Sequence, residues 1–74
     1  MNAAQELALR GDHITLDALM KACGLAPSGG AAKTMIAEGT VTVNGEVDTR
    51  RGRKLRAGDE VACGGRVVRV VAPT

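Results

Sequence analysis

Apolar residues recur at two spacings along this chain, and each change of spacing marks a new element. Alternating residues from Gln5 to Leu9 predict a short strand, followed by a turn at residues 11–13. From residue 16 onward the apolar positions fall three and four apart, as on one face of a helix. They are Leu16, Leu19, Met20 and Cys23. A second set with helical spacing consists of Ala32, Met35 and Ile36. The pattern therefore predicts two short helices in succession.

The residues at the ends of these two stretches are those that begin and end helices. Thr15 is placed to cap the first helix, and Gly24 can supply the left-handed residue that ends it. Pro27 prevents the helix from continuing, and Ser28 is placed to cap the second helix, which ends at Gly39. We therefore expect a helix-turn-helix-like pair with a connection of about four residues.

After Gly39 the apolar spacing becomes two, which is typical of strands. Val41 and Val43 share one side, and the following Asn44-Gly45 pair predicts a tight hairpin because a type I′ turn needs positive φ at both central residues. The return strand begins at Val47.

Two later stretches complete the predicted sheet. One strand begins at Val61 after the turn at residues 57–59, and the last covers residues 67–71. The fold class is therefore α+β, with two short helices packed on a small antiparallel sheet of four to five short strands. With 74 residues and no aromatic side chain, residues 1–74 are expected to form a single domain with a shallow binding surface rather than a deep cavity.

Charge is concentrated in one segment, residues 50–56, which we call the basic loop. It holds five cations and no acid, and these are Arg50, Arg51, Arg53, Lys54 and Arg56. Without them the net charge of +2 becomes −3 for the rest of the chain. Mutual repulsion among five cations costs stability unless a partner relieves it, and phosphates do so while releasing counterions. A basic loop on a mildly acidic body predicts a polyanionic partner, although a solvated surface run is the ordinary alternative.

The start of the second helix is the other candidate binding feature. Ser28 is followed by Gly29 and Gly30, so the first backbone amides carry no side chains and a phosphate could approach them closely. Lys33 lies one turn further on and adds a positive charge. The alternative is a capped turn in which the glycines serve only the backbone conformation.

Catalytic and metal-binding residues are not recognisable in this sequence. His13 is the only histidine and lies in a turn without an evident nucleophile nearby. Cys23 and Cys63 are 40 residues apart, which fits no common zinc framework and favours free structural thiols. We expect no enzyme activity, no metal and no cofactor. No secretory signal or membrane span is legible, so a cytoplasmic chain is expected.

Taken in order, the motifs resemble the S-four RNA-binding domain, or αL motif, over about residues 13–63. They are Thr15-Leu16-Asp17-Ala18-Leu19, Ser28-x-x-x-Ala32-Lys33-x-x-Ile36-x-x-Gly39, Val41-x-Val43-Asn44-Gly45 and Gly58-Asp59-Glu60-Val61. The small residues before Ala32-Lys33 resemble most closely the small stand-alone bacterial members. Where the wider family often has arginine, this chain has Thr15 and Gly29.

This resemblance implies a non-catalytic protein, expected to be a monomer, that grips the backbone of structured RNA. The RNA would be ribosomal or transfer RNA, the role would be accessory to translation or ribosome assembly, and the ribosome itself would be a further partner. The start of the second helix and the basic loop would then lie side by side on one concave surface. The residues implied in RNA binding are Ser28, Gly29, Gly30, Lys33, Asn44, Arg50, Arg51, Arg53, Lys54 and Arg56.

Two other functions are compatible with parts of the sequence. A protein-interaction module could use the basic loop to dock on an acidic partner. A ubiquitin-like sulfur carrier resembles the stretches around Asn44-Gly45 and Gly58-Asp59, but such carriers end in Gly-Gly, whereas this chain ends in Ala72-Pro73-Thr74. The absence of aromatic residues argues against reading of single-stranded RNA by base stacking.

Overall fold

A computed structural model describes residues 4–73 of the chain. Two short strands, β1 (Gln5–Ala8) and β2 (Ile14–Thr15), precede the helices α1 (Leu16–Ala22) and α2 (Gly29–Ala37). The remaining strands are β3 (Val41–Val43), β4 (Glu46–Val47), β5 (Lys54–Leu55), β6 (Glu60–Cys63) and β7 (Arg66–Val71). The two predicted helices and the predicted strands at both ends of the chain are confirmed.

Five of the strands form one sheet in the order β1-β7-β6-β3-β4. The pairs β3–β4, β3–β6 and β6–β7 are antiparallel, as predicted, but β1 runs parallel to β7, with Leu7 opposite Val70. The sheet is therefore mixed. The pairs β3–β4 and β6–β7 are each joined by a tight turn and must be antiparallel. By contrast, β1 and β7 are far apart in the sequence, so nothing local fixed their relative direction.

A second, two-stranded sheet pairs β2 with β5, with Ile14 opposite Leu55. The sequence did not predict it, since two residues are too few to show an alternating pattern and Lys54 lies inside a charged run. This small sheet attaches the end of the basic loop to the residues just before α1.

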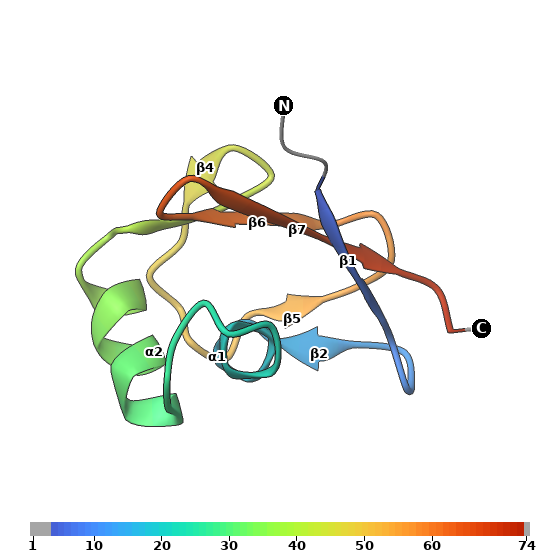
Figure 1. Cartoon of the computed structure of the whole chain (residues 1–74), viewed down its shortest axis with the longest axis horizontal. Helices are drawn as coiled ribbons and strands as arrows, with labels where there is room; N and C mark the ends of the chain where they lie inside the picture. Colours follow the sequence, from blue (N-terminus) through green and yellow to red (C-terminus); the bar gives the residue numbers. More distant parts are fainter. Residues whose placement is uncertain (1–3, 74) are drawn as a thin grey trace.

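Both helices lie on one side of the five-stranded sheet (Figure 1). The core between these layers is continuous and consists of aliphatic residues, Met20 and the two cysteines. Its largest fully buried side chains are Leu16, Leu19, Met20, Ile36, Leu55, Val41, Val61, Val68 and Val70. On the other side of the sheet the exposed large apolar side chains are Val47 and Val67. The helices therefore cover one sheet face and leave the other without a covering layer.

The predicted turn and cap residues have the backbone conformations that their roles require. Gly24 and Gly39, which follow the helices, have φ of 72° and 77°. Asn44 and Gly45 have φ of 53° and 87°, as a type I′ hairpin demands. Ser28 caps α2, because its Oγ accepts a hydrogen bond of 3.1 Å from the amide of Ala31.

The start of α1 differs from the prediction. Thr15 occupies the N-cap position, but its side chain makes no capping hydrogen bond. The first helical amides instead donate to the basic loop: Leu16 N to the carbonyl of Arg53 at 2.9 Å, and Asp17 N to that of Arg51 at 3.1 Å. These carbonyls accept from amides that have no acceptor within the helix, as the oxygen of a capping side chain otherwise does. As a result, the backbone of the basic loop is fastened to the start of α1.

The predicted thiols and turn histidine are found as expected. Cys23 and Cys63 are free and buried, and burial raises the pKa of the Cys23 thiol. The His13 ring lies 2.8 Å from the exposed carboxylate of Asp12. Among residues 4–73, no three His, Cys, Asp or Glu side chains are grouped as a metal site would require. No helix in that range is long and apolar enough to cross a membrane.

Candidate nucleic-acid interface

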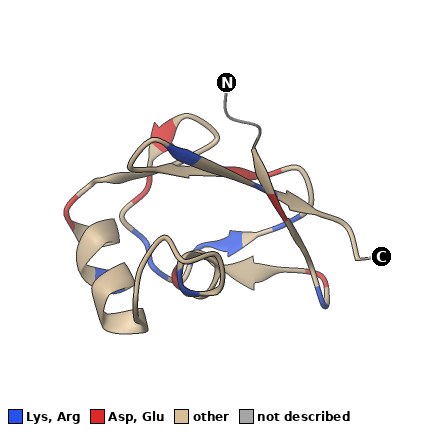
Figure 2. Ribbon diagram, in the orientation of Figure 1, with Lys and Arg blue, Asp and Glu red and all other residues tan. Residues whose placement is uncertain are grey.

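The basic loop, residues 50–56, follows the β3–β4 hairpin, includes β5 and passes beside the helices (Figure 2). The side chains of Arg50, Arg51, Lys54 and Arg56 are exposed, and that of Arg53 is partly buried. Leu55 is fully buried and anchors the end of the loop in the core. The loop is thus held at its C-terminal end by an apolar side chain while its cations face solvent.

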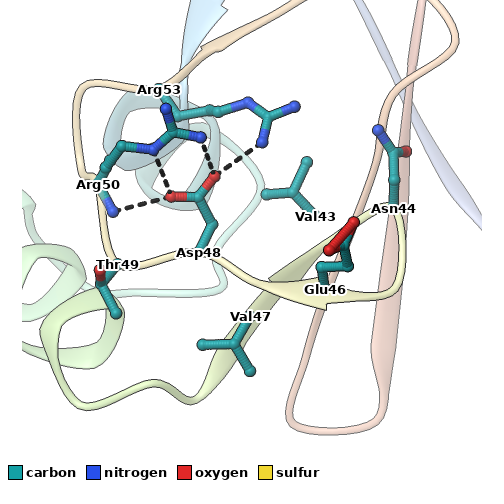
Figure 3. A pocket seen from close by; sticks show the side chains of 8 residues that line it. All are labelled: Val43, Asn44, Glu46, Val47, Asp48, Thr49, Arg50 and Arg53. Carbon is teal, nitrogen blue, oxygen red and sulfur yellow. Dashed lines mark hydrogen bonds and ion pairs between the residues drawn. The ribbon is translucent and has the colours of Figure 1, made fainter.

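A buried carboxylate lies immediately before the loop. Asp48 is only 6% exposed and is the one buried charged residue among those described. Its Oδ1 accepts hydrogen bonds from the amide and Nε of Arg50 at 2.9 and 3.1 Å. Its Oδ2 accepts from Nη2 of Arg50 at 2.9 Å and from Nη1 of Arg53 at 2.8 Å. Figure 3 shows the carboxylate with both guanidinium groups directed toward it.

These contacts determine the charge state of the cluster. The hydrogen bond from the Arg50 side chain, helped by those from the Arg50 amide and from Arg53, holds the pKa of Asp48 well below its usual range against the opposing effect of burial. The same pairing raises the pKa of Arg50. Asp48 is therefore ionised at neutral pH and offsets part of the positive charge of two arginines.

Asp48 corrects the sequence-based reading of the basic loop. The sequence-based interpretation assumed that only an external partner would offset the repulsion among the five cations. In the structure, the Asp48 carboxylate offsets part of it from within the protein. The acid stands two positions before Arg50, just outside the segment that was counted. An acid directly after a predicted strand and just before a run of cations is a sequence signal for an internal ion pair.

Three cations of the loop remain without a carboxylate partner. In the range 4–73, Arg51, Lys54 and Arg56 form no ion pair. The backbone near Arg56 is nevertheless fixed, because its amide donates to Asp59 at 2.8 Å. This bond, followed by one from Asn44, keeps the pKa of Asp59 below its usual value. The loop thus carries three unpaired charges on a backbone held at both ends.

A surface depression of about 390 Å³ lies between the β3–β4 hairpin and the basic loop. Its wall on the hairpin side includes Val43, Glu46 and Val47, and its wall on the loop side includes Arg50 and Arg53 (Figure 3). Asp48 lies at the junction of the two sides. A polar group of a ligand could enter this depression and reach both arginines.

The start of α2 keeps the features that the sequence predicts. Gly29 and Gly30 are exposed and have no positive φ, and a Cβ atom at Gly29 would meet nothing within 4 Å. Neither a positive φ nor a close approach therefore requires glycine at these two positions. Their amides have no hydrogen-bond acceptor among the described residues, and Lys33 is exposed one turn further on. The segment remains accessible to an anion.

The structure brings some predicted site residues together and keeps others apart. The basic loop contacts the start of α1, and the end of α2 lies against β4, where a Cβ atom at Gly39 would come 3.6 Å from Val47. The start of α2 is at the opposite end of a nine-residue helix, about 13 Å away at the usual rise per residue. No hydrogen bond joins the basic loop to Ser28–Gly30 within residues 4–73. Their joint surface stays a prediction.

Asn44 is held by contacts within the protein. Its side-chain amide donates to Asp59 at 3.0 Å, and its carbonyl oxygen accepts from the amide of Glu60 at 2.9 Å. These bonds tie the β3–β4 hairpin to the turn before β6. They give Asn44 a structural role, and the predicted contact of this residue with RNA is not tested by them.

Comparison with known proteins places the chain in a family. The sequence profile of the S4 domain matches residues 7–71. The "Putative RNA-binding protein YbcJ" of Escherichia coli (strain K12) is 47% identical over 60 residues, which are 81% of this chain and 86% of that protein. The "Probable ribosome maturation protein RlbA" of Bacillus subtilis (strain 168) is 43% identical over 58 residues, 78% of this chain and 82% of that protein.

A solved structure agrees with the fold. The solution structure of Escherichia coli YbcJ, described as revealing an alpha-L motif involved in RNA-binding, matches with a TM-score of 0.73 at 41% identity, over 97% of this chain and 92% of that one. The chain therefore shares the alpha-L fold of that structure, with both of its helices on one side of the sheet. The chain belongs to the S4-domain family, and its relatives are small proteins, as the motif order predicted.

Proposed function

We propose that this protein binds the backbone phosphates of structured RNA and catalyses no reaction. The observation that carries the proposal is the basic loop, in which three exposed cations without ion-pair partners stand on a backbone fixed to α1 and to the core. Exposed charges on a fixed backbone are poorly explained by packing, and phosphate contacts would offset their repulsion. Two relatives support the assignment: the Escherichia coli protein is named as RNA-binding, and the Bacillus subtilis protein is named for ribosome maturation.

The second contact is the start of α2. The exposed amides of Gly29 and Gly30, the Ser28 hydroxyl and Lys33 would receive a phosphate. Arg50, Arg51, Arg53, Lys54 and Arg56 would receive others. The basic loop and the start of α2 belong to separate segments of the chain, and we infer that they contact different phosphates of the RNA. This geometry favours a folded RNA, whose strands bring distant phosphates together.

The RNA that we propose is ribosomal, and the role is accessory to ribosome assembly in the cytoplasm, with the protein acting as a monomer. The named role of the Bacillus subtilis relative supports this choice over transfer RNA. Stacking of bases on aromatic side chains contributes nothing, because the chain has no aromatic side chain. Recognition would therefore depend on the shape and backbone of the RNA.

A titration with competing polyanions tests the proposal. A fluorescently labelled ribosomal RNA stem-loop is titrated with the protein, with transfer RNA, single-stranded RNA and polyglutamate as unlabelled competitors. We expect the unlabelled stem-loop to compete best and polyglutamate to compete weakly. Equal competition by polyglutamate would favour docking on an acidic protein, and better competition by single-stranded RNA would contradict recognition of folded RNA.

A pair of variants locates the binding surface. Arg51→Gln removes an unpaired cation from the basic loop, whereas Arg10→Gln removes one from the turn between β1 and β2, on the far side of the molecule from α2 (Figure 1). Both lower the net charge by one. We expect Arg51→Gln to weaken binding severalfold and Arg10→Gln to leave it nearly unchanged. Equal effects would mean that only net charge matters.

A further inference from the structure

Asp48 is an unexpected residue at a surface proposed to bind phosphate. It is ionised, and its carboxylate contacts two arginines that line the depression beside the hairpin. A negative charge repels a phosphate approaching the same arginines, so attraction alone would favour its absence. Its presence therefore suggests a contribution to binding other than charge.

The contacts of Asp48 hold the side chains of Arg50 and Arg53 in place but leave most of their N–H donors available. A guanidinium group has five N–H donors in a planar fork. Arg50 uses two of them on Asp48, which leaves three, and Arg53 uses one, which leaves four. The side chain of Arg50 stays 70% exposed although it is held at two points. Figure 3 shows both groups gathered around the one carboxylate.

We propose that Asp48 is a positioning residue for RNA binding, which holds Arg50 and Arg53 in advance as a paired phosphate receptor. The inference rests on the proposed function. Long side chains lose rotamer freedom when they bind, and this loss weakens the complex unless it has already occurred in the free protein. The buried carboxylate orders both side chains during folding. Its position at the end of β4, with its amide bonded to the carbonyl of Val41 at 3.2 Å, keeps it immobile.

Glu46 provides a matched comparison for Asp48. It lines the same depression, is exposed, and makes no ion pair within residues 4–73. The variants Asp48→Asn and Glu46→Gln each remove one negative charge near the arginines. If charge alone mattered, both would bind RNA more tightly and with a steeper dependence on salt.

Positioning predicts opposite signs for the two variants. With a labelled ribosomal RNA stem-loop, Glu46→Gln should bind slightly more tightly than the wild type. Asp48→Asn should bind about tenfold more weakly despite its higher positive charge, which corresponds to the freedom regained by two long side chains. Tighter binding by Asp48→Asn would overturn the proposal.

Two further measurements make the result decisive. In an Arg50→Gln/Arg53→Gln background, adding Asp48→Asn should no longer weaken binding, since no arginine remains to be positioned. If Asp48→Asn does not fold, as judged by circular dichroism, ¹⁵N relaxation of the Arg50 and Arg53 Nε–H groups in the free wild-type protein replaces it. These groups should be as rigid as the backbone, and mobile side chains would refute positioning. Failure of the wild type to bind any RNA would refute the proposed function instead, whatever the relaxation data show.

Discussion

Neutralising the three unpaired cations of the basic loop should reduce the salt dependence of RNA binding without unfolding the protein. The variant is Arg51→Gln/Lys54→Gln/Arg56→Gln. All three side chains are exposed and have no ion-pair partner in residues 4–73, whereas Arg50 and Arg53 remain with Asp48. Exposed substitutions of this kind change the free energy of unfolding by about 0.5 kcal/mol or less each. The variant should therefore test charge separately from fold.

The expected magnitude follows from the number of charges removed. Each phosphate contact contributes about 0.7 to 0.9 to the slope of the logarithm of the binding constant against the logarithm of salt concentration. Three contacts then amount to a slope change of about 2 to 3. Between about 50 and 200 mM salt, the wild type should lose about 20- to 40-fold more affinity than the variant.

The assay is fluorescence anisotropy with a ribosomal RNA stem-loop at several KCl concentrations. The control variant is Arg10→Gln/Arg69→Gln, which removes cations from the β1–β2 turn and from the sheet strand β7, and its slope should match that of the wild type. Arg50 and Arg53 are unsuitable for a simple charge reversal, because a new carboxylate there would face the buried Asp48. An unchanged slope in a folded triple variant would show that the basic loop does not contact phosphate.

Three further outcomes follow from the structure. Ser28→Ala removes the side-chain N-cap of α2 and should lower the free energy of unfolding by about 1 kcal/mol. Calorimetry would register this loss as a fall in Tm of about 4 to 8 °C. An unchanged Tm would mean that the bond to Ala31 is not formed in solution. Asp48 has a pKa lowered from 3.8 in the folded protein, so its stabilising contribution is present above that ordinary value and is lost as the pH falls toward the folded value. Urea unfolding should therefore show that the free energy of unfolding decreases as the pH falls from neutral to about 3. Asp48→Asn should make this pH dependence weaker. The same pH dependence in the variant and the wild type would contradict the pairing of Asp48 with the arginines. Asn44→Ala removes hydrogen bonds to Asp59 and Glu60 and should cost about 1 to 3 kcal/mol in urea unfolding, while RNA affinity measured on the folded variant should stay near that of the wild type if the role of Asn44 is structural.

Much of the fold could be predicted because it depends on local signals. The spacing of Leu16, Leu19 and Met20 makes one helix face apolar, and that face is buried as expected. Residues with positive φ at Gly24, and at Asn44 with Gly45, terminate a helix and close a hairpin wherever the rest of the chain lies. Such signals act over a few residues, so they can be read without knowing the tertiary structure.

The parts that could not be predicted depend on contacts between distant segments. The parallel pairing of β1 with β7 and the small β2–β5 sheet join residues that are tens of positions apart. The capping of α1 by the carbonyls of Arg51 and Arg53 is of the same kind. Local sequence was compatible with other arrangements, such as a β1 strand without a defined partner or a side-chain cap from Thr15. Tertiary packing favoured the arrangements that the structure shows.

The candidate site divides in the same way. The sequence by itself determined that cations gather in residues 50–56 and that two glycines open the second helix, since both are matters of composition and spacing. Only the tertiary structure decided which of those cations are free, because the Asp48 carboxylate is buried and held against both Arg50 and Arg53 only in the folded chain. A carboxylate's effect on its neighbours depends on distance and burial, and these are properties of the folded chain.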